Sequence, residues 1–266
     1  MSRCVSWRTR NLIAAAAAIL LANCGGGGGG SEVTGSGTAA NTFEWQIPPS
    51  QVVDGGPGKD GIPSIDEPKF ETAAATTDVA PDHYVVAVVV DGEIKAYPHN
   101  ILDWHEVVND TRGNRSFVMS YCPLTGSALA WEADTNSTNP EYGVSGLLYN
   151  SNLILYDRAT GSRWSQMLER SVWGARAGEN AERLQVIETT FSTLQAMYPS
   201  AKVLTRDTGW QRDYNAYPYD SYRTDENLLF PVEREDNRLH PKTRVIGIRS
   251  APDTNDSKVY QLAAFG

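Results

Sequence analysis

The stretch that decides the fold is Tyr84-Val85-Val86-Ala87-Val88-Val89-Val90, followed by Asp91-Gly92 and then by Glu93-Ile94-Lys95-Ala96-Tyr97. A run of β-branched residues, a two-residue Asp-Gly turn and a second run of alternating polarity together predict a β-hairpin. The first run is apolar on both faces, so we expect it to be a central strand that is covered on both sides. The hairpin therefore predicts a fold built on β-sheets.

Patterns farther along the chain extend this prediction. A second hairpin is expected from 142–149 and 153–156, and further strands are expected at 117–122, 128–131, 162–167, 202–204, 244–248 and 258–263. One helix is predicted to begin at Pro98-His99-Asn100, with Ile101, Leu102, His105 and Val108 on its inner face. A second short helix is expected after Thr189 or Thr190. Together these elements predict a mainly β or α+β fold in a single domain: an antiparallel sheet or meander barrel with two or more short helices.

The N-terminus has the layout of an export signal. Three arginines at positions 3, 8 and 10 precede the apolar segment 12–22, which is too short for a membrane-spanning helix of about 20 residues. The junction Leu21-Ala22-Asn23-Cys24 resembles the lipobox of bacterial lipoproteins. That resemblance implies a signal peptide over 1–23 and a diacylglyceryl (palmitate-type) lipid on Cys24, which would be the contact with the membrane.

A flexible tether and a folded domain are expected after the lipid. Residues 24–42 are rich in glycine and serine and have too few apolar side chains to fold, whereas 43–266 should form one globular β-rich domain. Gly25 resembles the residue after the lipidated cysteine in lipoproteins sorted to the outer membrane. We therefore expect an exported protein that is anchored to the cell envelope, at the outer membrane, and faces the periplasm or the cell surface.

The charge of the chain limits the classes of partner. The full sequence has a net charge of −9, and without Arg3, Arg8 and Arg10 it holds 20 basic against 32 acidic residues, which gives −12. An excess of negative charge disfavours nucleic acid and anionic lipid surfaces as partners. The sequence also has no Gly-x-Ser-x-Gly elbow, phosphate loop or dinucleotide fingerprint, so common hydrolase and nucleotide functions have no support.

One thiol remains in the mature protein and is the first candidate for chemistry. Cys4 lies in the signal peptide and Cys24 is expected to be lipidated, which leaves Cys122 in Tyr121-Cys122-Pro123-Leu124-Thr125-Gly126-Ser127. Alternation along 117–122 places Cys122 on one face of its strand and Met119 on the other. Because proline cannot donate a ladder hydrogen bond, the strand should end at Pro123.

Cys122 and the inward-facing His105 allow two kinds of site. Thiolate and imidazole suit copper or zinc, with Met167 as a possible thioether ligand, in a metal-binding or redox protein. Alternatively, Cys122 is the nucleophile and His105 the base of a thiol enzyme for acyl transfer or hydrolysis of envelope material. The turn after Cys122 would then supply N–H donors, with Glu106, Thr125 and Ser127 as further catalytic candidates. The purely structural alternatives are a buried histidine bonded to backbone and a small buried hydrophobe.

Two polar groups could instead serve a non-catalytic binding module. One is formed by Asp157, Arg158, Trp164 and Gln166. The other is a tyrosine-rich loop with Arg212, Tyr214, Tyr217, Tyr219 and Tyr222, whose rings could stack on a sugar ring or an aromatic ligand. The structural alternatives are a turn-stabilising ion pair for the first group and a loop packed by its own rings for the second.

Several ordered motifs resemble one family. Segments that include Trp104-His105-Glu106-Val107-Val108-Asn109-Asp110, 121–128, 143–151, 161–166 and Arg212-Asp213-Tyr214 are similar to exported bacterial and archaeal proteins known as domain of unknown function 3179. The resemblance covers nearly all of the chain after the tether and implies no activity. Many relatives have a second cysteine where this chain has Thr125, so a mechanism that needs a Cys-x-x-Cys pair cannot operate here in that form. Whether the protein is an enzyme, its cofactor and its small-molecule or protein partner stay open.

Overall fold

The hairpin predicted from residues 84–97 is confirmed in the computed structural model, as strands β3 (Tyr84–Val90) and β4 (Glu93–Pro98). Asp91 and Gly92 both have positive φ, at 48° and 77°, which is the conformation of a two-residue turn that matches the twist of the strands. Strand β3 lies between β12 (Gln185–Thr190) and β4, so it is a central strand, as its two apolar faces predicted.

The structure describes residues 43–133, 141–249 and 257–264. The predicted signal peptide 1–23, the predicted lipid acceptor Cys24 and the predicted tether 24–42 lie outside these residues. Residues 42–266 form one compact unit, and no helix of the described part is long and apolar enough to cross a membrane.

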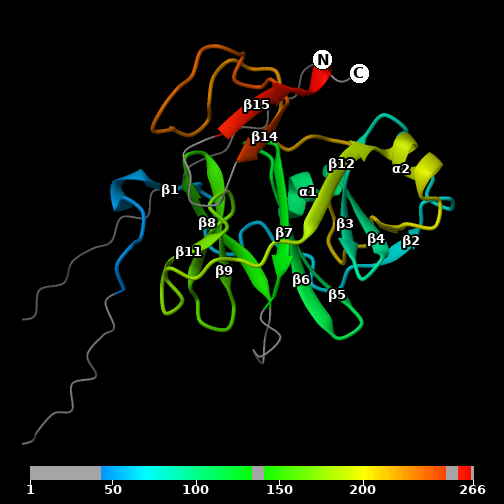
Figure 1. Ribbon diagram of the computed structural model, residues 1–266, viewed down its shortest axis with the longest axis horizontal. Helices are drawn as coiled ribbons and strands as arrows, with labels where there is room; N and C mark the ends of the chain where they lie inside the picture. The colour runs from blue at the N-terminus through cyan, green and yellow to red at the C-terminus, as the bar shows by residue number, and fades with distance from the viewer. Residues whose placement is uncertain (1–42, 134–140, 250–256, 265–266) are drawn as a thin grey trace, which may run out of the picture. The chain divides into compact units, whose positions relative to one another are not determined.

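The described strands form three larger sheets and one separate hairpin (Figure 1). The β3 sheet has the order β12-β3-β4-β13-β2, in which β2 is Phe70–Thr72 and β13 is Lys202–Leu204. The central sheet has the order β5-β6-β7, with β5 at Val107–Arg112, β6 at Arg115–Cys122 and β7 at Ser127–Glu132.

The third sheet, the β9 sheet, has the order β1-β8-β9-β10-β11. Its strands are β1 at Val52–Asp54, β8 at Tyr142–Tyr149, β9 at Asn152–Asp157, β10 at Arg163–Ser165 and β11 at Arg170–Trp173. The separate hairpin pairs β14 (Val245–Arg249) with β15 (Ser257–Gln261).

The fold is mostly β, as predicted. Of the two predicted arrangements the sheet is the one found, because the described strands form open sheets and no closed barrel. β13 pairs with β4 in parallel and with β2 antiparallel.

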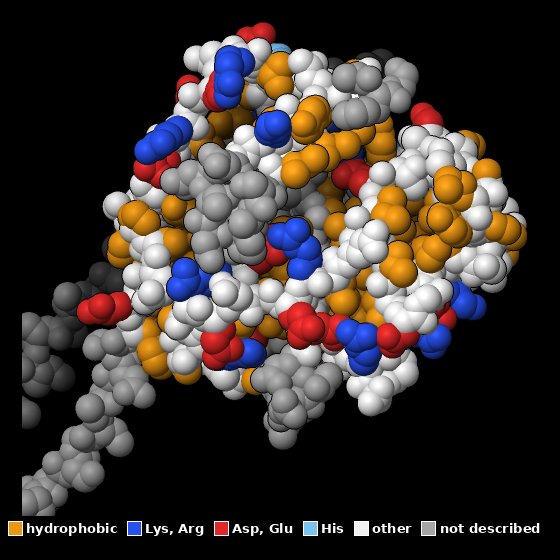
Figure 2. Space-filling view, in the orientation of Figure 1, with side chains coloured by type: hydrophobic (Ala, Val, Ile, Leu, Met, Phe, Trp, Pro, Cys, Tyr) orange, Lys and Arg blue, Asp and Glu red, His pale blue; other side chains and the backbone are white. Residues whose placement is uncertain are grey.

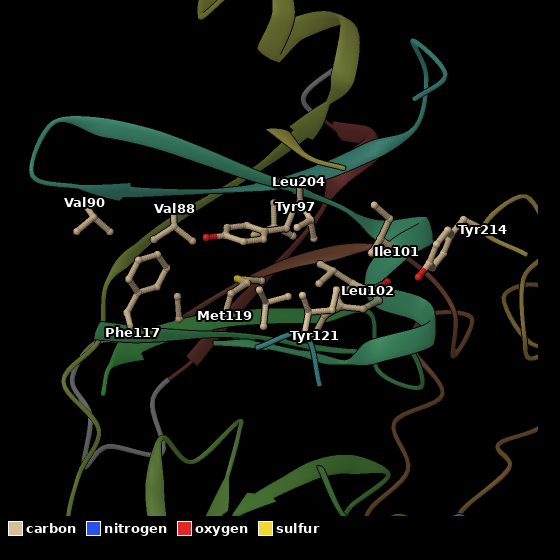
Figure 3. Close-up of a cluster of buried hydrophobic side chains, with 14 residues drawn as sticks. Val88, Val90, Tyr97, Ile101, Leu102, Phe117, Met119, Tyr121, Leu204 and Tyr214 are labelled. Atoms are coloured by element: carbon tan, nitrogen blue, oxygen red, sulfur yellow. The ribbon is translucent and has the colours of Figure 1, made fainter. Parts of the chain in front are cut away.

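The central sheet separates two hydrophobic cores, and strand β6 contributes alternate residues to each. Phe117, Met119 and Tyr121 point toward the β3 sheet, where Figure 3 shows them facing Val88, Val90 and Tyr97. Val118 and Cys122 lie in the other core, together with side chains of the β9 sheet. The alternation predicted for this strand is therefore confirmed, and both of its faces are buried.

Small hydrophobic clusters cover the outer faces of the two flanking sheets, the β3 sheet and the β9 sheet. Helix α2 (Phe191–Met197) packs Phe191 and Leu194 on the β3 sheet, and its N-cap Thr190 accepts a hydrogen bond from the Thr193 backbone N–H. Ile47, from the arm before β1, covers the β9 sheet. Figure 2 shows hydrophobic side chains on the surface near α2 and β12, where Ile187 and Met197 are exposed. Short 3₁₀ turns occur at Pro49–Gln51 and Leu262–Ala264.

Helix α1 (His99–His105) is shorter than predicted. His105, Ile101 and Leu102 face inward as expected, but Val108 belongs to β5 and not to the helix. The helix ends at His105, because the next residue, Glu106, has a φ of 60° that is incompatible with a further α-helical turn. Val107 and Val108 are β-branched and pair with Ser120 and Met119 in β6, so tertiary pairing determines their conformation.

Candidate functional site

Cys122 ends strand β6 inside the core shared with the β9 sheet. Its side chain is 1% exposed, and its Sγ lies 3.7 Å from the Ser151 carbonyl oxygen, to which the thiol donates. Burial raises the pKa of the thiol to about 11, and the nearby Glu106 carboxyl adds to this shift. Cys122 is therefore a protonated, buried thiol at neutral pH, whereas an activated nucleophile has a lowered pKa.

His105, at the end of α1, uses both of its ring nitrogens. Nδ1 lies 2.8 Å from the Pro63 carbonyl oxygen and Nε2 lies 2.7 Å from the Tyr214 hydroxyl. A carbonyl can only accept, so Nδ1 donates to Pro63 and Nε2 accepts from Tyr214, whose hydroxyl in turn accepts from Thr208 at 2.6 Å. Burial lowers the pKa of His105, which keeps the imidazole neutral.

These contacts do not link Cys122 and His105 directly. Neither ring nitrogen of His105 is free to take the Cys122 proton or to bind a metal without first losing a present partner. Met167 is 52% exposed and lies outside the buried cluster that holds Cys122. Within the described ranges, no three His, Cys, Asp or Glu side chains converge as a metal site. The Cys122–His105 metal site and the thiol enzyme stay predictions.

The turn after Cys122 is held by a network of uncharged polar side chains. Asn152 Nδ2 donates to Thr125 Oγ1 at 3.0 Å, to Ser127 Oγ at 3.1 Å and to Gln166 Oε1 at 2.8 Å. Gln166 Nε2 in turn donates to the buried Ser120 hydroxyl at 3.1 Å. Thr125, Ser127 and Gln166, which the sequence proposed as site residues, thus join the turn to β9 and β10. Asn152 and Ser120 are members that the sequence did not single out.

Asp157, Trp164 and Arg158 also make structural contacts. Asp157 accepts from the Thr160 backbone N–H at 2.6 Å and from Trp164 Nε1 at 3.0 Å, which stabilises the turn before β10. Arg158 donates to Asp66 at 2.8 Å and to Ser64 at 2.7 Å, and so fixes the segment in which Ile65 pairs with Val108 of β5. The structure places these three residues in turn and loop contacts rather than around a shared hollow.

A pocket of about 350 Å³ lies close to the Cys122 turn and draws its walls from five parts of the chain. The arm before the β3 sheet contributes Ile62 and Pro63, and the β9 sheet contributes apolar side chains that include Leu148 and Leu153. Leu124 comes from the Cys122 turn. The rest of the wall is made by the end of α1 and by the tyrosine-rich loop, with Asp103, Trp104, Glu106, Arg212, Pro218, Tyr219 and Phe230. The walls are mostly apolar, with a few polar groups, which is typical of a small-molecule site.

Glu106 is the most unusual polar residue of this pocket. It is 5% exposed, and its backbone is in the left-handed region, which a non-glycine residue adopts at an energetic cost. Its N–H donates to the Leu102 carbonyl and its carbonyl accepts from the Tyr121 N–H at 2.7 Å, so the backbone is fixed on both sides. The Tyr219 hydroxyl donates to Oε1 of the carboxyl at 3.2 Å.

Burial changes the protonation of Glu106. It raises the pKa of the carboxyl to about 8, with Asp103 adding to the shift and the Tyr219 hydrogen bond opposing it. At neutral pH the carboxyl is therefore largely protonated. A strained, buried residue with such a pKa in a concave site is a candidate functional group.

Asp103, one turn earlier on α1, has a charged partner. Arg223 Nη2 donates to both carboxylate oxygens, at 2.8 and 2.6 Å, and its guanidinium stacks on Tyr217 with 3.9 Å to the ring centroid. Burial raises the pKa of Asp103 to about 6, and Arg223 opposes this shift. At neutral pH the Asp103–Arg223 pair is thus close to electrically neutral.

Sequence reasoning named part of this pocket. Glu106 and Arg212 were among its candidates, and both line the pocket. Tyr214 does not line this pocket, but its hydroxyl is bonded to His105. Tyr214 and Arg212 both line a second, wider hollow of about 530 Å³. Asp103 was missed, and Tyr219 was named only as one ring of the tyrosine-rich loop, without its contact with Glu106. The signal that could have found Asp103 is an acidic side chain next to the inward-facing Leu102, whereas no local pattern indicates which tyrosine of the loop reaches Glu106.

Comparisons with known proteins bear on identity and not on activity. A search of curated proteins and a search of solved structures each found no match. Comparison with protein families matches residues 59–264 to a family described as a protein of unknown function (DUF3179). These residues include the central sheet, the Cys122 turn and most of the pocket wall. The chain therefore belongs to the DUF3179 family.

Proposed function

We propose that the protein binds a small molecule in the pocket between α1, the β9 sheet and the tyrosine-rich loop. The observation that carries this proposal is an apolar hollow of about 350 Å³ with the buried Glu106 carboxyl in its wall. Small-molecule sites have volumes of roughly 300–1,000 Å³, apolar walls and a few oriented polar groups, and this pocket has all three properties.

The contacts of Cys122 and His105 favour binding over thiol chemistry. The Cys122 thiol is buried with a raised pKa, and His105 is a neutral link between Pro63 and Tyr214. Through this link His105 positions two flanks of the pocket, because Pro63 lines it and Arg212 lies two residues before Tyr214. A role for both residues in building the site agrees with their burial.

The place of this binding is part of the proposal. The signal peptide 1–23, a lipid on Cys24 and the tether 24–42 would hold the domain at the outer membrane, facing the periplasm or the cell surface. A tethered domain with a net negative mature chain fits a small-molecule partner better than nucleic acid. We therefore propose a lipid-anchored binding protein of the cell envelope.

The experiment is a titration with the neutral fluorescent probe N-phenyl-1-naphthylamine, whose emission increases in apolar sites. We expect saturable binding with one probe per chain. The substitution Ile62→Trp should abolish it, because Ile62 is a half-buried wall residue and the larger ring would occupy the hollow. Melting temperature and circular dichroism would show that the variant is folded.

The matched control is Met197→Trp, which adds the same ring at an exposed position of α2, away from the pocket walls. It should leave probe binding unchanged. The proposal fails if the probe does not bind saturably, or if folded Ile62→Trp binds it as well as the unsubstituted protein does.

A further inference from the structure

We infer that the ligand of this pocket carries an ammonium group that pairs with the Glu106 carboxylate. This inference rests on the proposed function, since it names the chemical class of the ligand in the same pocket. It starts from the hydrogen bonds of Glu106. Oε1 accepts from Tyr219, and among the residues that the structure describes the other carboxyl oxygen, Oε2, has no hydrogen-bond partner.

An unpartnered oxygen on a buried side chain in a pocket wall needs a donor. Within the described part of the chain, Glu106 Oε2 is not one of the fully buried side-chain atoms that lack a partner, so this oxygen is open to the pocket that Glu106 lines. Glu106 cannot turn away from the pocket easily, because its backbone is held by Leu102 and Tyr121 on either side. A ligand in the pocket can therefore supply the donor to Oε2.

The other charged groups of the wall favour a cation as this donor. Arg223 already neutralises Asp103 at 2.6 Å, and Arg212 is at an exposed position with its guanidinium 6.0 Å from the Trp104 ring centroid. Glu106 is therefore the acidic group of the pocket wall that has no cationic partner among the described residues. The remaining walls are apolar, so the rest of the ligand should be hydrocarbon or aromatic.

Protonation couples to binding in a defined way. Burial raises the pKa of Glu106 to about 8, so near pH 7 the free site is mostly the neutral acid. When an ammonium ion binds, the O–H bond of the acid breaks, the proton passes to solvent and the carboxylate pairs with the ammonium. Binding at pH 7 should thus release close to one proton, and affinity should fall about tenfold for each pH unit below 8.

Other titratable groups near Glu106 set the pH range of the test. Asp103 faces it from α1, Cys122 from β6 and Tyr219 from the loop, with Arg212 at the wall. The arm and the β9 sheet contribute no titratable side chain to the wall. Burial raises the pKa of Asp103 to about 6, whereas the shifts of Cys122 and Tyr219 are upward, away from neutrality. Between pH 6.5 and 8.5 the change in affinity for the ammonium ligand therefore reports mainly on the protonation of Glu106.

The experiment compares three probes of equal chain length: octylammonium, 1-octanol and octanoate. Each displaces N-phenyl-1-naphthylamine from the full-length protein, and calorimetry in two buffers of different ionisation enthalpy measures proton release. We expect octylammonium to bind at least about tenfold more tightly than 1-octanol. The reason is that the ammonium group forms a buried charge pair with the Glu106 carboxylate, whereas the alcohol has no charge to pair with it. Octanoate should bind more weakly than both.

The variant Glu106→Gln keeps the shape of the side chain and removes its charge. It should lose the preference for octylammonium and the proton release while still binding 1-octanol, which also shows that it is folded. The control Glu67→Gln removes a carboxylate at an exposed position outside the pocket and should keep both properties.

Two failures are distinguishable. Equal binding of octylammonium and 1-octanol, or a preference that survives Glu106→Gln, overturns the assignment of an ammonium ligand and leaves the pocket function in place. Absence of any saturable binding, including that of the naphthylamine probe, overturns the proposed function itself.

Discussion

His105 Nε2 lies 2.7 Å from the Tyr214 hydroxyl, and this contact joins residues 109 positions apart in the chain. The hydroxyl is the donor, because the other ring nitrogen already donates to Pro63. One imidazole thus connects α1, the arm before the β3 sheet and the tyrosine-rich loop. These are three of the segments that surround the pocket, so the geometry of the pocket depends on a neutral histidine.

His105→Ala should destabilise the fold. The substitution leaves the Pro63 carbonyl and the Tyr214 hydroxyl without a buried partner and opens a cavity, for a loss of about 3 kcal/mol. Chemical denaturation at pH 7.5 measures it. His83→Ala, at an exposed position, is the control and should change stability by less than about 0.5 kcal/mol. Equal effects at the two positions would contradict the role of His105.

Cys122 should react slowly with thiol reagents in the folded protein. Its burial and its pKa of about 11 leave little thiolate at pH 8, so modification by dithionitrobenzoate should be about a hundredfold slower than in urea. The measurement uses a chain in which Cys4 and Cys24 are replaced by serine. Rapid labelling without denaturant would instead support the thiol-enzyme alternative.

The stability of the protein should fall as pH rises through 8. The folded-state pKa of Glu106 is raised above its usual value, so its contribution is fully present below about pH 4.5 and is lost as pH rises through about 8. Asp103 acts in the same direction at about pH 6. Glu106→Gln should therefore be more stable than the unsubstituted protein at pH 9, by an amount on the order of a few kcal/mol.

The comparison at pH 5 is the control for this effect, because both side chains are then uncharged and the two proteins should differ little. Melting temperatures at the two pH values give the result. Below about pH 6.5, both proteins should also lose stability for a second reason, which is common to them. Burial lowers the pKa of His99 to about 3 and also lowers that of His105, so protonation of the unfolded chain below about pH 6.5 favours unfolding. If the melting temperatures of Glu106→Gln and the unsubstituted protein differed by the same amount at pH 5 and at pH 9, this result would contradict the raised pKa of Glu106.

The polar network behind Cys122 should be stabilising through its buried members. Asn152→Ala removes donors to Thr125, Ser127 and Gln166 and leaves the buried Gln166 oxygen with fewer partners, for a loss of about 2 kcal/mol. Thr125→Ala, at an exposed position, should cost about 0.5 kcal/mol or less. Urea denaturation of both variants checks the ranking, and a larger loss for Thr125→Ala would show that the exposed hydroxyl is the important one.

Gly146 should be required for the wall of the pocket. Its φ is 80°, and a Cβ there would lie 2.6 Å from the backbone of Gly58, while its carbonyl accepts from the Gly55 N–H at 2.8 Å. Gly146→Ala should therefore displace the arm, destabilise the protein by about 2 kcal/mol and weaken binding of the naphthylamine probe. Gly247→Ala, in a strand with open space around it, is the matched control and should leave probe binding unchanged.

Much of the local structure was predictable because its causes are local. The Asp91-Gly92 turn and the flanking β-branched runs produced the hairpin, and alternation in 117–122 correctly assigned Cys122 and Met119 to opposite faces. The C-terminal part of α1 was not predictable in this way. Val108 fits a helical face by spacing, and only its pairing with Met119 in β6 makes it part of a strand.

The sequence by itself determined a β-rich domain, a buried His105 and the polar character of the segments around Cys122, because periodicity and turn chemistry act between near neighbours. It also carries the motifs that place the chain in the DUF3179 family. Only the tertiary structure decided what those residues contact. The pocket is assembled from segments that include Ile62, Glu106, Leu148 and Tyr219, and His105 bonds to partners 42 and 109 positions away. Such contacts depend on how three sheets stack, and burial there, rather than any local pattern, sets the protonation of Glu106 and Cys122.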